Sequence, residues 1–168
     1  MTPEEFAAAY PKMLAWIQKT LAYHQKDARS IASMQFTRLP LYFAERTLQT
    51  TKFILLDRVP IPPLSTMGLA RFATFEPGNF DGITYLDTYF LRNHAERNEA
   101  LHFHELIHVI QWRLLGPDRF LAAYADGLER FGYENSPLEK MAYEAEKLFR
   151  DGSTRFDPEK YVAQRLTA

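Results

Sequence analysis

The sequence contains no cysteine, and only five of its 168 residues are histidine. The absence of cysteine excludes a disulfide framework, a thiolate zinc site, an iron–sulfur cluster and a cysteine nucleophile. A metal ion would therefore have to be bound by histidine, aspartate or glutamate. Neither sign of charge is in excess, because 20 lysines and arginines balance 21 aspartates and glutamates, for a net charge of -1. We expect no general attraction to nucleic acid or to an anionic membrane surface.

Long hydrophobic runs are also missing. No stretch of about 18 uncharged apolar residues occurs, so no membrane-spanning helix is predicted. The first residues lack the basic region of a signal peptide. These absences predict a soluble, cytoplasmic protein. The length is typical of one domain, and 46% hydrophobic residues are enough for a sizeable core, so we expect a single domain over residues 1–168.

Helical patterns lie at both ends of the chain. Thr2 and Glu5 have the spacing of a capping box, and apolar residues then recur with helical spacing as far as Leu21. Gly116-Pro117 is a typical helix stop. Further helices are predicted over residues 40–49, 98–115, 118–131 and 136–150, with a weak terminal helix after residue 158.

The middle of the chain is rich in β-prone residues. Strands are predicted over residues 52–59, 69–75 and 83–91, each bounded by proline, glycine or asparagine. Because these strands lie between helical ends, we expect an α+β fold with the helices on one face of a small antiparallel sheet. The segment 82–89 is the candidate for an edge strand that a peptide could pair with.

The most informative motif is His104-Glu105-Leu106-Ile107-His108, an HExxH pattern on the predicted helix 98–115. Residues four apart lie on the same side of a helix, so both imidazoles can bind one Zn²⁺. Glu105 lies at the edge of the same sector, where it can reach a metal-bound water without being a ligand. A chain of this composition would contain such a match by chance only about 0.01 times.

The remaining histidines do not share this geometry. His102 projects away from His104 on the helix, and we expect it at the surface or facing a partner. His24 and His94 lack any paired spacing and are expected to be structural. The alternative for the HExxH pair is that both are hydrogen-bonded core histidines without a metal.

A catalytic zinc site needs a third protein ligand. Glu139 is the best candidate, because it lies in the first turn of the helix that Ser136 and Pro137 are expected to open. That position also makes it a possible capping partner of Ser136. Four other glutamates remain as rivals: Glu129, Glu134, Glu144 and Glu146.

Two segments carry a family resemblance: residues 104–112 (HELIHVIQW) and residues 136–143 (SPLEKMAY). The chain resembles the gluzincin metallopeptidases and is similar, more narrowly, to small bacterial proteins with an HELxHxxQ helix. The resemblance covers about residues 83 to 147 and implies a zincin-like fold with zinc ligands His104, His108 and Glu139 and Glu105 as general base. The chain departs from the family at Tyr143, where gluzincins with an ExxAD helix have an aspartate that orients a ligand histidine.

These patterns predict a zinc-dependent metallohydrolase, most simply a peptidase acting on a peptide or protein. Zinc would lower the pKa of its bound water, and Glu105 would take the proton and later deliver it to the leaving amine. Tyr124, Tyr133 and Tyr143 are the available donors to the oxyanion. The alternatives are a non-catalytic metal-binding module on the same scaffold and a partner-binding protein.

Overall fold

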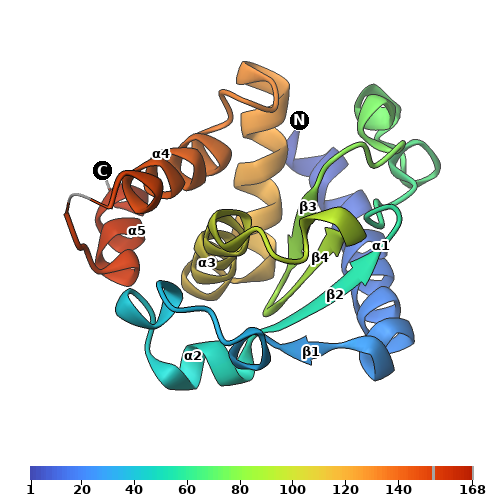
Figure 1. Ribbon diagram of the computed structural model, residues 1–168. Coiled ribbons are helices and arrows are strands. Elements are labelled where there is room, and N and C mark those ends of the chain that lie inside the picture. The colour runs from blue at the N-terminus through green and yellow to red at the C-terminus, as the bar shows by residue number, and fades with distance from the viewer. Residues whose placement is uncertain (153, 168) are drawn as a thin grey trace.

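The computed structural model describes residues 1–152 and 154–167. They form an α+β fold, as predicted (Figure 1). The helices are α1 (Pro3–His24), α2 (Glu45–Thr50), α3 (Glu99–Phe131), α4 (Pro137–Asp151) and α5 (Pro158–Leu166). The strands are β1 (Arg29–Ser30), β2 (Lys52–Leu56), β3 (Gly82–Tyr85) and β4 (Thr88–Arg92). Among the described residues, no helix combines the length and apolar character needed to cross a bilayer.

The predicted antiparallel sheet is wrong, because the four strands form a mixed sheet in the order β1-β2-β4-β3. β2 and β4 run parallel, whereas the β1–β2 and β3–β4 pairs are antiparallel. The predicted strand 83–91 is instead the β3–β4 hairpin, whose turn contains Leu86 with φ of 60°. This hairpin places β4 beside β2 and leaves β3 at the edge of the sheet, so only residues 82–85 of the predicted edge segment 82–89 form an edge strand.

Helices cover both faces of the sheet, not one face as predicted. Thr84 of β3 contacts Glu105 of α3, so α3 lies on the face that Thr84 shares with Tyr89 of β4. The opposite face carries Tyr85, which packs against Trp16 of α1 with ring centroids 5.7 Å apart. β4 is buried between the two helical layers, which explains its apolar sequence.

The predicted strand 69–75 is also wrong. This segment is a 3₁₀ helix over Ala70–Phe75, and another 3₁₀ helix precedes it at Leu64–Met67. Leu69 and Phe72 are nevertheless buried and pack against α1. Leu69 and Phe72 are three residues apart, a spacing that suits a 3₁₀ helix. Gly68 precedes them with φ of 89°, so the backbone there is not extended.

The helix predicted over residues 40–49 is shorter, since α2 begins only at Glu45 and follows a 3₁₀ turn at Leu39–Leu41. The Thr2–Glu5 capping box of α1 is confirmed by both of its hydrogen bonds, of 2.9 and 3.2 Å. α4 begins at Pro137 with Ser136 as its N-cap residue, and it ends one residue later than predicted.

α3 contains both helices that were predicted on either side of Gly116-Pro117. Gly116 has φ of 76° and ψ of 164°, so the helix bends sharply there and continues in another direction (Figure 1). The first half of α3 is buried between the sheet and α4, and residues 102–112 are buried without exception. This half carries the HExxH motif in the interior of the molecule.

Candidate metal centre

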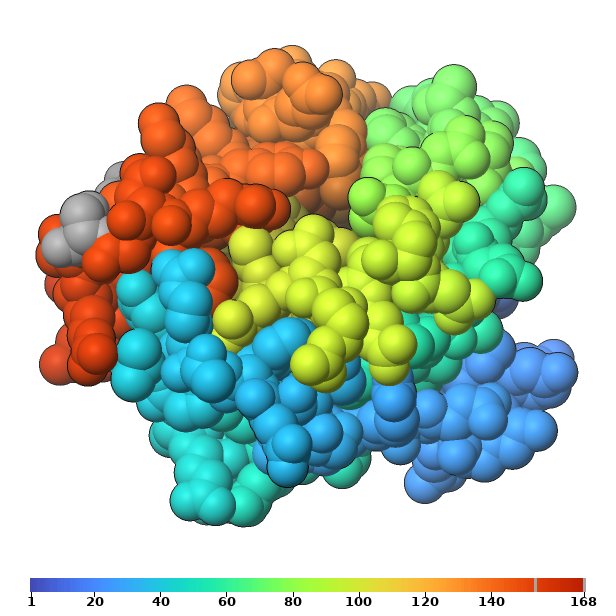
Figure 2. Space-filling view, in the orientation of Figure 1, coloured from blue at the N-terminus to red at the C-terminus, as the bar shows by residue number. Residues whose placement is uncertain are grey.

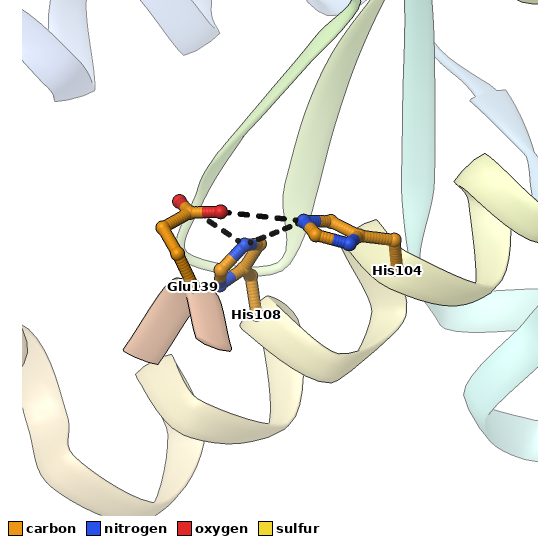
Figure 3. Close-up of side chains that lie close together, drawn as sticks. All are labelled: His104, His108 and Glu139. Atoms are coloured by element: carbon orange, nitrogen blue, oxygen red, sulfur yellow. Dashed lines mark hydrogen bonds and ion pairs between the residues drawn. The ribbon is translucent and has the colours of Figure 1, made fainter. Parts of the chain in front are cut away.

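Two elements bring three potential metal ligands together. His104 and His108 extend from the first half of α3, and Glu139 extends from the first turn of α4 (Figure 3). The two Nε2 atoms are 3.1 Å apart, and each lies 3.4 Å from an oxygen of Glu139. Ligands bound tetrahedrally at the usual zinc distances would be about 3.3 Å apart. The three predicted ligands therefore lie close enough together to bind one metal ion.

The donor set fits a metal ion in burial as well as in distance. His104, His108 and Glu139 are 3%, 5% and 2% exposed. Among the described residues, no hydrogen-bond donor with acceptable geometry reaches Glu139 Oε2. A buried carboxylate oxygen without a partner is costly, and a cation between the two imidazoles would satisfy it.

Gln111 orients His108. The side-chain amide nitrogen of Gln111 donates to the backbone oxygen of Leu138 over 3.0 Å, so the amide oxygen faces His108 Nδ1 at 2.8 Å. Because that oxygen can only accept, Nδ1 carries the proton and the Nε2 lone pair points toward Glu139. The ligand nitrogen is thereby left free to bind a metal.

Glu146, one of the rival ligands, orients His104 instead. Its Oε2 lies 3.2 Å from His104 Nδ1, on the side of the ring opposite Nε2. Arg150 holds the other carboxylate oxygen with contacts of 2.6 and 2.8 Å. A carboxylate on the outer nitrogen of a ligand histidine fixes the ring and increases its basicity. Tyr143 makes no such polar contact, and its ring packs against His104 with the ring centroids 4.6 Å apart.

The other three rivals lie elsewhere. Glu129 pairs with the amino group of Met1 and with Arg71. Glu134 and Glu144 are exposed. Of the five carboxylates considered as third ligand, only Glu139 joins the two histidines in the cluster.

Tyr124 binds Glu139 directly. Its hydroxyl donates to Glu139 Oε1 over 2.6 Å, and this hydrogen bond joins the second half of α3 to α4. This hydroxyl is therefore committed to a ligand carboxylate, which weakens the case for Tyr124 as a donor to an oxyanion. The sequence gives no local signal for the contact, because it depends on the bend at Gly116.

The electrostatic field of the cluster favours positive charge. Burial alone would lower the pKa of His104, but the neighbouring carboxylates of Glu139 and Glu146 raise it to about 10. The pKa of His108 is also raised, because the charge of Glu139 outweighs burial. Burial opposes ionisation of Glu139, yet its pKa is lowered by the charge of His108 and by the close approach of both imidazoles. Cationic charge, whether a proton or a metal ion, is thus stabilised where these three side chains meet.

Glu105 does not join the ligand cluster but lies against strand β3. Thr84 Oγ1 donates to Glu105 Oε2 over 2.6 Å. On the same strand, a Cβ atom at Gly82 would overlap Glu105 Oε1, so only glycine leaves room for the carboxylate. Burial raises the pKa of Glu105 above its usual value, which suits a group that exchanges protons.

The prediction that His102 faces the surface is wrong, since its side chain is fully buried. The Tyr89 hydroxyl lies 2.5 Å from His102 Nδ1, and the backbone oxygen of Glu96 lies 2.9 Å from His102 Nε2. Both ring nitrogens are thus engaged on the side of α3 opposite the ligand cluster. His102 is a hydrogen-bonded core histidine.

Two hollows adjoin the cluster. One is a polar recess lined by His104, Glu105, Tyr133 and Tyr143, together with residues 79–82 of the loop and β3. Figure 2 shows the surface hollowed where the orange half of α3, the red-orange α4 and the yellow-green chain near residue 80 meet. The other is an apolar cavity that reaches Glu105, His108 and Glu139 from the opposite side. The cluster is therefore buried but not sealed from space that a substrate could occupy.

Comparisons with known proteins give no independent indication of function. A scan against protein-family models and searches of curated proteins and of solved structures all found no match to this chain.

Proposed function

We propose that this chain is a zinc-dependent metallohydrolase that acts on peptide bonds, with His104, His108 and Glu139 as ligands and Glu105 as general base. The observation that carries the proposal is a buried cluster in which the two imidazole Nε2 atoms are 3.1 Å apart and each lies 3.4 Å from one of the two oxygens of Glu139, beside the separate buried carboxylate of Glu105. Zinc bound there would supply a Lewis acid and lower the pKa of a bound water.

The surrounding residues support hydrolysis rather than a purely structural metal site. The cluster in the described part of the chain contains three ligands, and a catalytic zinc keeps its fourth position for water. Glu105 lines both hollows that adjoin the cluster, so its carboxylate faces the space in which a substrate would lie. Held by Thr84, it would take a proton from the attacking water and pass it to the leaving amine.

The edge strand supports a peptide as the substrate. β3 is hydrogen-bonded to β4 on one side only, and its residues Gly82 and Thr84 contact the general base. An extended peptide could add to that free edge and place a carbonyl next to Glu105. An antiparallel edge strand, an HExxH helix and a glutamate from a following helix are the elements expected of a zincin-like fold, and their presence supports the proposal.

Metal analysis of the purified protein tests the ligand set. We expect one zinc per chain in the wild type and its loss in both His104→Ala and Glu139→Ala. Retention of zinc by the Glu139 variant would show that another residue is the third ligand. Stoichiometric iron instead of zinc would point to oxygen chemistry and contradict the proposal, because two histidines and a carboxylate can also bind ferrous iron.

Turnover of a peptide mixture tests the role of Glu105. Glu105→Gln keeps the size of the side chain and removes the base, so we expect a full complement of zinc and loss of activity. Surviving activity in this variant would show that another group accepts the proton.

A further inference from the structure

A large apolar cavity lies directly beside the ligand cluster. Its volume is about 130 Å³, and one end is formed by Glu105, His108 and Glu139. The walls come from parts of the chain far from the HExxH motif. They include Met13 and Ile17 of α1, Leu69 and Phe72 at the 3₁₀ helix Ala70–Phe75, and Leu121 and Ala125 of the second half of α3. Spaces much larger than a water molecule are few in close-packed protein interiors.

The cavity has the dimensions of one ring-sized group. An engineered cavity of about 150 Å³ lined by leucine, isoleucine and phenylalanine binds benzene. The cavity here is slightly smaller and has a similar lining. It would hold the side chain of a leucine, methionine or phenylalanine, but not a long acyl chain.

Two of the hydroxyl groups at the end of the cavity near the cluster already donate to carboxylates. Thr84 donates to Glu105, and Tyr124 donates to Glu139. No lysine or arginine is among the residues that line the cavity. An anionic group that entered would therefore lose its hydration without gaining a cationic partner.

We infer that this cavity is the specificity pocket of the site and binds one large apolar side chain of the substrate, next to the bond that is cleaved. The inference rests on the proposed function and adds the substrate class. All four residues of β3, Gly82–Tyr85, line the cavity. A peptide that pairs with this edge therefore runs past its mouth, and a side chain next to the reacting carbonyl can enter.

Ala125 offers a direct test of the pocket. Ala125→Leu adds apolar atoms at the cavity wall, whereas Ala123→Leu makes the same change at an exposed position of the same helix. Benzene binding is measured on the purified proteins by methyl NMR shifts of the leucine, isoleucine and methionine side chains. We expect binding by the wild type and the Ala123 variant and at least a tenfold weaker affinity in Ala125→Leu. Thermal unfolding of all three proteins verifies that the Ala125 variant is folded.

The binding experiment requires no turnover, so its result is separate from that of the proposed function. Absence of benzene binding to the wild type, or equal binding by a folded Ala125→Leu, would overturn the pocket even if the protein binds zinc and cleaves peptides. With zinc-loaded protein and a peptide mixture, cleavage sites should be flanked by leucine, methionine or phenylalanine. Ala125→Leu should shift this preference at least tenfold toward alanine and glycine.

Cleavage next to charged or small residues by the wild type would overturn the inference while leaving the hydrolase intact. Benzene binding without hydrolysis of any peptide would overturn the proposed function, and with it the assignment of this pocket to a substrate side chain.

Discussion

Replacement of Glu146 gives a quantitative test of how the site is built. Its carboxylate accepts from His104 Nδ1 at 3.2 Å and is held by Arg150 at 2.6 Å. In Glu146→Ala the imidazole keeps its position on α3 but loses the group that fixes its orientation. Loss of such an outer partner lowers metal affinity about 10- to 100-fold, which corresponds to roughly 1.4 to 2.7 kcal/mol.

The affinity for zinc is measured by competition with a chromophoric chelator at fixed pH. Glu144→Ala is the matched control, because Glu144 is an exposed glutamate on the same helix and lies outside the ligand cluster. We expect the control to bind zinc as tightly as the wild type. Glu146→Gln should fall between the wild type and Glu146→Ala, since it keeps an acceptor oxygen but loses the charge.

Two results would refute this reasoning in different ways. Equal zinc affinity in Glu146→Ala and Glu144→Ala would show that the 3.2 Å contact does not orient His104. Loss of zinc as complete as in His104→Ala would show that Glu146 is itself a ligand and not a positioning residue.

Three further substitutions test separate parts of the structure. Gly82→Ala should displace Glu105, because the new Cβ would occupy the space of its carboxylate. We expect turnover to fall at least 100-fold while the zinc content stays at one per chain. Unchanged turnover would show that the position of the carboxylate is not critical. Tyr124→Phe removes the 2.6 Å hydrogen bond to Glu139, and we expect about tenfold weaker zinc binding by chelator competition, in keeping with the loss of a hydrogen bond to a charged group. Phe149→Ala should lower the free energy of unfolding by about 3 to 5 kcal/mol in urea titrations, since this fully buried ring of α4 stacks on Phe103 in the hydrophobic core; a loss below 1 kcal/mol would contradict that packing.

The ligand cluster follows from local sequence signals. His104 and His108 share a helix face by their spacing alone, and the Ser136-Pro137 helix start places Glu139 in the first turn of α4. Glu146 lies two helical turns beyond Glu139 and so on the same face of α4. It was one of the four rival ligands, and the structure places it on the outer nitrogen of His104.

The errors come from contacts between distant parts of the chain. The helical projection placed His102 away from the ligand face, which is correct, but the inference that this side is exposed failed. Tyr89 and the backbone of Glu96 cover it, so the first half of α3 is buried all round. The parallel pairing of β2 with β4 likewise depends on how the chain returns over some thirty residues, which no local pattern specifies.

The bend at Gly116 determines the position of side chains at both the ligand cluster and the cavity. Glycine followed by proline was predicted to end a helix, and the backbone at Gly116 is indeed non-helical, with φ of 76°. Because the chain resumes its helix after this bend, Tyr124 reaches Glu139 while Leu121 and Ala125, on the same half of α3, form a wall of the cavity. A straight continuation of α3 would carry all three side chains away from the histidines. The bend therefore lets one helix supply both histidines of the candidate metal cluster and part of the wall of the adjacent cavity.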